Sequence, residues 1–81
     1  MDEELSFEVV MTDVVKRHSE LHFSYDGVFY WIAHFNKGSH ISDENGNTQY
    51  FKNAQTLFQE VTIKGKHLSE IWSEIEIDSL N

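Results

Sequence analysis

The sequence predicts one α+β domain over residues 1–81, with an N-terminal helix, a three- to four-stranded antiparallel sheet of hairpins and two C-terminal helices. Three observations lead to this fold class. Apolar residues recur at helical spacing near both ends of the chain, aromatic and β-branched runs occupy the middle, and an Asp-Gly pair separates two of those runs. Helices that flank a block of strands, instead of alternating with them, are typical of α+β domains.

The first segment, residues 5–18, fits a helix better than a strand. Acidic residues dominate its start and basic residues its end, an order that suits the helix dipole. A strand remains the alternative, because valine is a poor helix former and apolar residues also alternate at the start of the segment. The helical face would consist of Phe7, Val10, Met11, Val14 and His18.

Two hairpins are expected in the middle of the chain. Asp26-Gly27 predicts a two-residue turn between residues 21–25 and 28–32. A shorter hairpin with a polar tip joins residues 40–43 to residues 48–51. The two-residue turn of the first hairpin sets its register, which pairs Tyr25 with Val28, Phe23 with Tyr30 and Leu21 with Ile32. These six residues form one apolar face.

Two helices are expected after the strands. Asn53 can cap the first of them. The second follows the turn Lys64-Gly65-Lys66, and residues 78–81 beyond it are expected to fray. The apolar residues are Leu57, Phe58 and Val61 in the first helix and Leu68, Ile71, Trp72 and Ile75 in the second.

Charge and composition restrict the partners. Acidic residues outnumber basic ones by 14 to 6, so the formal net charge is −8, and such a surface repels the phosphates of DNA and RNA. The start, Met1-Asp2-Glu3-Glu4, has neither the basic nor the apolar region of a signal peptide, and no apolar run is long enough to span a membrane. A soluble cytoplasmic protein is expected, and the absence of cysteine fits a reducing compartment.

No catalytic set is recognisable. Among the five histidines, His18 and His22 are four residues apart, but the helix is expected to end between them. The loop at residues 43–47 lacks the glycine and glutamate of a calcium-binding loop, and Glu74 and Glu76 would point to different faces of a helix. No serine lies in a nucleophile elbow. We therefore expect no enzyme activity, no cofactor and no metal.

The central strand, residues 28–35, is apolar on both faces. Tyr30 and Ile32 lie on one face, and Phe29, Trp31 and Phe35 lie on the other. A strand with one face in water would instead alternate apolar and polar residues. Either helices cover both faces of the sheet, or one face is partly open and binds a partner or a second copy of the chain.

A loose pattern of structural residues runs from Phe23 to Ile77. It consists of Phe23, Tyr25, Gly27, Tyr30 and Ile32, followed after the polar hairpin by Ile63, Gly65, Lys66, Leu68, Ile71 and Trp72. In this pattern the chain is similar to small uncharacterised proteins of Gram-positive bacteria and their prophages. The resemblance implies a bacterial or phage source and brings no active site with it.

These features favour a non-catalytic protein-interaction module, with sheet aromatics or the Trp72 helix as anchors. Self-association in a monomer–dimer equilibrium is the related expectation, because a small domain with an apolar sheet gains stability from an isologous contact. The candidate partner-binding residues are Phe29, Trp31, Phe35, Glu70 and Glu74.

Two further functions stay open. One is a phage or mobile-element inhibitor that mimics nucleic acid through the carboxylates of Glu70, Glu74, Glu76 and Asp78. The other is an enzyme or ligand carrier with a cavity between the sheet and the helices.

Overall fold

The structure is a computed structural model that describes residues 5–81; the start Met1-Asp2-Glu3-Glu4, on which the signal-peptide argument rests, lies outside the described residues. Helices and strands follow one another along the chain with short connections. The elements are α1 (Phe7–Arg17), β1 (Leu21–Tyr25), β2 (Val28–Phe35), β3 (Gly38–Asp43), β4 (Thr48–Phe51), α2 (Ala54–Glu60), β5 (Thr62–Ile63), β6 (Lys66–His67), α3 (Leu68–Ile71), the 3₁₀ turn η1 (Trp72–Glu74) and β7 (Glu76–Leu80).

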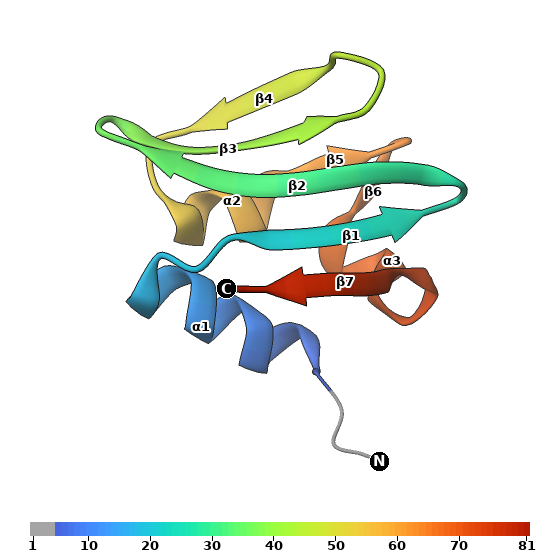
Figure 1. Ribbon diagram of the computed structural model, residues 1–81, viewed down its shortest axis with the longest axis horizontal. Coiled ribbons are helices and arrows are strands. Elements are labelled where there is room, and N and C mark those ends of the chain that lie inside the picture. Colours follow the sequence, from blue (N-terminus) through green and yellow to red (C-terminus); the bar gives the residue numbers. More distant parts are fainter. Residues whose placement is uncertain (1–4) are drawn as a thin grey trace.

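The main sheet is antiparallel and has five strands in the order β4-β3-β2-β1-β7, while β5 and β6 form a small hairpin of their own. In Figure 1, α2 and α3 lie behind this sheet and α1 lies along its β7 edge, and none of the helices of residues 5–81 lies in front. The α+β class, the N-terminal helix and the two C-terminal helices are confirmed. The sheet has one strand more than the largest number expected, because the C-terminus adds β7.

The hairpin at Asp26-Gly27 has the predicted register, with Tyr25 opposite Val28. Asp26 and Gly27 both have positive φ, +52° and +79°, as a type I′ turn requires. Lys64 and Gly65 repeat this geometry, with φ of +55° and +81°, in the turn between β5 and β6. The local turn chemistry therefore fixes both hairpins.

The N-terminal segment is a helix, and the strand alternative is wrong. The Ser6 hydroxyl accepts a hydrogen bond from the Val9 backbone N–H at 3.2 Å and so caps the start of α1. Val10 and Val14 are fully buried in the hydrophobic core, and α1 contacts α2; this burial outweighs the low helix propensity of valine. His18 ends the helix in a left-handed conformation, φ +56°, instead of extending its apolar face.

The C-terminal segment differs most from expectation. The last helix ends after one turn at Ile71, and residues 76–80 form β7, which pairs with β1. Fraying of the tail is also wrong, because the backbones of Glu20 and Asn81 exchange two hydrogen bonds, of 2.9 and 3.0 Å. Ile75 and Ile77 alternate with acidic residues, which is the periodicity of a strand. The segment forms a strand because it can pair with the edge of β1 that β2 leaves free.

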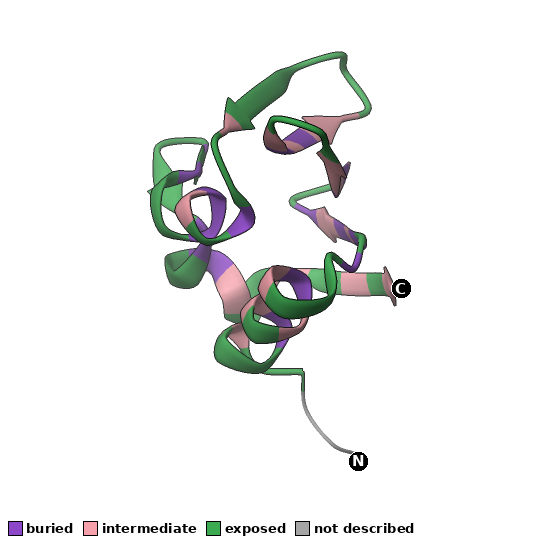
Figure 2. Ribbon diagram, turned by 90° about the vertical axis from the view of Figure 1, so that its left-hand side faces the viewer, coloured by how far each residue is buried: buried purple, intermediate pink, exposed green. Residues whose placement is uncertain are grey.

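The core lies between the sheet and the helices. In the edge view of Figure 2, the buried residues of the two layers face each other, and no element of the described part of the chain covers the opposite side of the sheet. The interpretation that helices cover both faces is therefore wrong. The helices contact one another, α1 with α2 and α2 with α3, so they form a single layer. The largest fully buried side chains are Phe23, Phe58, Leu21, Ile32, Leu57, Leu68, Ile71, Val10, Val14 and Val61.

Candidate functional site

The uncovered side of the sheet carries most of the aromatic side chains that do not reach the core. Successive residues of a strand point to opposite faces, and directly paired residues of neighbouring strands share a face. His22 pairs with Trp31, and His40 pairs with Tyr50. We call the following residues the aromatic face: His22, Phe29, Trp31, Phe35, His40 and Tyr50.

The side chains of the aromatic face form two clusters. In the first, the ring centroid of Phe29 lies 5.9 Å from that of His22 and 5.7 Å from that of Trp31. In the second, the rings of Phe35 and Tyr50 meet edge to face at 5.9 Å. His40 completes this second cluster, at 6.0 Å from Phe35 and 5.9 Å from Tyr50. These contacts hold the rings in place on a rigid sheet.

Exposure separates this face from the core face of the same strands. Tyr50 is 70% exposed and Phe35 is 42% exposed, whereas Ile32 on the core face of β2 is 0% exposed. Phe29 and Trp31 are partly buried, but by their neighbours on the face, since neither packs against the hydrophobic core. The three aromatic residues that the sequence nominated thus lie together, outside the core.

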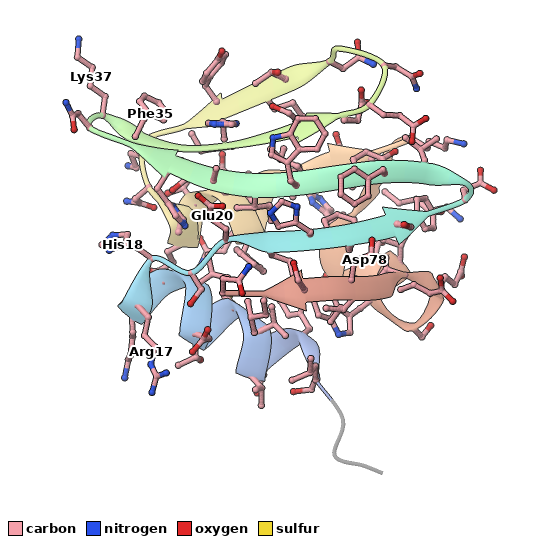
Figure 3. The ribbon with its side chains drawn as sticks, viewed as in Figure 1. Arg17, His18, Glu20, Phe35, Lys37 and Asp78 are labelled. Carbon is pink, nitrogen blue, oxygen red and sulfur yellow. The ribbon has the colours of Figure 1, made fainter. Side chains whose placement is uncertain are left out.

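Carboxylates border the aromatic face on the side of β7. Glu76 lies opposite Ser24 on β1, and the Ser24 hydroxyl donates a hydrogen bond of 3.2 Å to Asp78. The Glu20 carboxylate lies 3.8 Å from the His22 ring nitrogen, and its side chain is 55% exposed. Figure 3 labels Glu20 and Asp78 over β1 and β7, on the side of the sheet that faces the viewer. We call these three carboxylates, of Glu20, Glu76 and Asp78, the acidic margin.

The other two candidate partner-binding residues, Glu70 and Glu74, do not lie on this face. Glu70 lies on α3, where its carboxylate accepts a hydrogen bond of 2.8 Å from the His67 backbone N–H in a capping box. Glu74 lies in η1. The carboxylates proposed for nucleic-acid mimicry therefore come from three different elements, because the single long helix assumed for them does not form.

Trp72 has a structural role. Its indole N–H donates a hydrogen bond of 3.0 Å to the Leu5 carbonyl, and its ring meets Phe7 edge to face at 5.4 Å. A surface groove of about 660 Å³ runs beside this contact, between the start of α1 and the segment from α3 to β7. Trp72 therefore fastens the start of α1 to the last turns of the chain.

His34 sits at the end of the core face with a complete set of hydrogen bonds. Its Nε2 lies 2.8 Å from the Ser19 carbonyl oxygen, which can only accept, so Nε2 carries the proton. The buried Ser39 hydroxyl then donates to Nδ1 at 2.7 Å. A serine–histidine pair can support nucleophilic catalysis, but Ser39 is only 2% exposed. The pair ties the connection between α1 and β1 to the sheet.

Charged residues at three turns stabilise the hairpins. Lys64 and Asp26 form an ion pair between the tips of the two type I′ hairpins. This hydrogen-bonded pair lowers the pKa of Asp26 and raises the pKa of Lys64 relative to their usual values. At the tip between β3 and β4, Asp43 accepts backbone hydrogen bonds from Asn47 at 3.1 Å and Asn45 at 2.8 Å, which lower its pKa. The loop that resembles a calcium site is thus a self-contained turn.

Comparisons with known proteins found no match, so the functional interpretation rests on the residues described above. No protein-family model matches the chain, and no curated protein or solved structure is significantly similar to it. Within residues 5–81, no helix has the length and apolar character needed to cross a membrane, and no cluster of His, Cys, Asp and Glu side chains could hold a metal ion.

Proposed function

We propose that the chain is a non-catalytic, cytoplasmic protein-interaction module that binds a protein partner through its aromatic face. The observation that carries the proposal is the contrast along β2. Tyr30 and Ile32 on one side of this strand are buried in the core, whereas the aromatic residues on the other side, Phe29, Trp31 and Phe35, lie in an uncovered row. A bacterial or phage source, as the sequence resemblance implies, fits a small module of this kind.

Two properties of the face suit protein binding. Tyrosine and tryptophan are enriched among the residues that contribute most to binding energy in protein interfaces. This face offers one of each, Trp31 in the first cluster and Tyr50 in the second. Both residues lie on paired strands and touch aromatic neighbours, so little conformational freedom is lost when a partner binds. The negative charge of the chain argues against nucleic acid as the direct ligand.

A pair of matched double variants tests this proposal. The chain is used to capture partners from a bacterial lysate, each captured protein is identified and purified, and its affinity is then measured with purified components. Trp31→Ala/Tyr50→Ala removes one anchor from each cluster. Leu5→Ala/Val9→Ala is the control, since it removes two exposed apolar side chains near the start of α1, away from the face.

The two variants should behave differently toward the purified partner. Loss of an interface anchor costs about 2 kcal/mol or more, so the face variant should bind at least about thirtyfold more weakly while the control binds like the wild type. A folded face variant that binds every purified partner with wild-type affinity would exclude the aromatic face as the binding site.

A further inference from the structure

The charges around the aromatic face are all of one sign within the sheet. The five strands contain no lysine and no arginine, and they include Glu76 and Asp78. Glu20 extends the same row, because its backbone pairs with Asn81 beyond the end of β7. The acidic margin therefore lies beside exposed aromatic rings without a cation from the sheet itself.

The cations of the described chain lie elsewhere. Two of them are paired at other sites, Arg17 with Asp13 at 3.5 Å and Lys64 with Asp26. Figure 3 shows Arg17 and Lys37 at one end of the molecule, beyond the ends of the strands. The six lysine and arginine residues, Lys16, Arg17, Lys37, Lys52, Lys64 and Lys66, all belong to α1, turns or the small β5–β6 hairpin.

This arrangement suits a cationic side chain of the partner. The face of an aromatic ring attracts a cation through its quadrupole, and the attraction is strongest for tryptophan. A guanidinium can stack on such a ring and also donate two hydrogen bonds to a carboxylate, which an ammonium cannot do with the same geometry. Trp31 pairs with His22, and the His22 ring in turn lies beside the Glu20 carboxylate, so a single residue of β1 connects Trp31 to the acidic margin.

We infer that the partner presents an arginine-bearing, cationic surface, whose guanidinium groups stack on Trp31 and pair with the acidic margin. This inference rests on the proposed function of the aromatic face. A second copy of the chain is the less suitable occupant, because it would bring its own acidic margin against an acidic face.

Titration with short peptides tests the charge preference on the full chain. An oligo-arginine peptide and an oligo-lysine peptide of equal length are added separately, and the Trp31 indole N–H and the backbone amides are followed by NMR. The Glu76→Gln/Asp78→Asn variant removes two charges from the acidic margin. Glu8→Gln/Glu60→Gln is the matched control, since it removes two exposed charges from α1 and α2.

The arginine peptide should shift the Trp31 indole and the amides of β1, β2 and β7, and should bind about five- to tenfold more tightly than the lysine peptide. The acidic-margin variant should weaken arginine binding by about the same factor, while the control changes it little. Equal weakening by both variants, or shifts that spread over all acidic turns, would overturn the inference.

The same variants separate this inference from the proposed function. If the partner identified by capture loses affinity with Trp31→Ala/Tyr50→Ala but not with Glu76→Gln/Asp78→Asn, the aromatic face binds protein and the cationic partner is wrong. If neither variant affects the captured partner, both proposals fail.

Discussion

Two neighbouring residues of β2 give the sharpest test of the open face. Ile32 is fully buried beneath the helices, and Trp31 touches Phe29 on the aromatic face without reaching the core. Replacing Ile32 with alanine leaves a cavity and should cost about 2–5 kcal/mol. Replacing Trp31 with alanine removes aromatic contacts worth about 0.5–1.5 kcal/mol. Because the Trp31 side chain is only partly buried, the total loss of folding free energy should be about 1–2 kcal/mol.

These costs are large relative to the stability of so small a domain. A stability of roughly 0.05–0.15 kcal/mol per residue gives about 4–12 kcal/mol for this chain. Each kcal/mol lowers the Tm of a domain of this size by roughly 4–8 °C. The Ile32→Ala variant should therefore melt at least about 8 °C below the wild type. The melting temperature of the Trp31→Ala variant should lie between those of Ile32→Ala and the wild type.

Urea denaturation and thermal melting, both followed by far-UV circular dichroism, measure the difference between the two variants. Similar slopes in urea would show that both variants unfold as the wild type does. A Trp31→Ala variant that is destabilised as much as Ile32→Ala would refute the reasoning, because Trp31 would then belong to a packed interior.

The remaining predictions concern the framework of the sheet. Gly38→Ala should cost about 1–3 kcal/mol in urea denaturation, since its Cβ would collide with a backbone carbonyl of β4. Asn53→Ala should cost about 1 kcal/mol, because the Asn53 side chain caps α2 with a 2.7 Å hydrogen bond; an unchanged midpoint would rule that cap out as a source of stability. The lowered pKa of Asp26 means that its pair with Lys64 stabilises the fold above the ordinary pKa of about 4 and is lost as the pH falls toward the lowered value, so Asp26→Asn should flatten the acid end of a Tm–pH profile. Deletion of residues 76–81 should abolish cooperative unfolding in calorimetry, because it exposes the edge of β1.

Local signals explain why the hairpins could be predicted from the sequence. Asp26-Gly27 allows only a narrow set of turns, and the two-residue loop fixes the register of β1 against β2. Asn53 likewise acts on its own helix, through the N–H of Thr56 three residues later. These features depend on neighbours in the chain, so the chain alone specifies them.

The C-terminus could not be predicted in the same way because two periodicities overlap there. Leu68, Ile71 and Ile75 have helical spacing, while Ile75 and Ile77 have strand spacing. The choice depends on a partner far away in the sequence, since β7 completes the sheet by pairing with β1. Local propensity contains no information about that vacant edge.

The candidate site was predictable in part. The aromatic residues on both sides of β2 identified a possible binding face, but the sequence did not show that all helices would gather on the other side. Tyr50 was missed because its place beside Phe35 depends on the pairing of β4 with β3. Glu70 and Glu74 were nominated on the assumption of a long helix, which does not form.

Solvent paramagnetic relaxation in NMR, with a neutral gadolinium chelate, tests the central claim most directly. In the free protein, the Trp31 indole and the Tyr50 ring should relax strongly, as the exposed Val9 does, while Ile32 stays protected. Adding the purified partner should protect Trp31 and Tyr50 and leave Val9 unchanged. Protection of Trp31 and Tyr50 in the free protein, or continued relaxation when the partner saturates the chain, would contradict an open sheet face that binds protein.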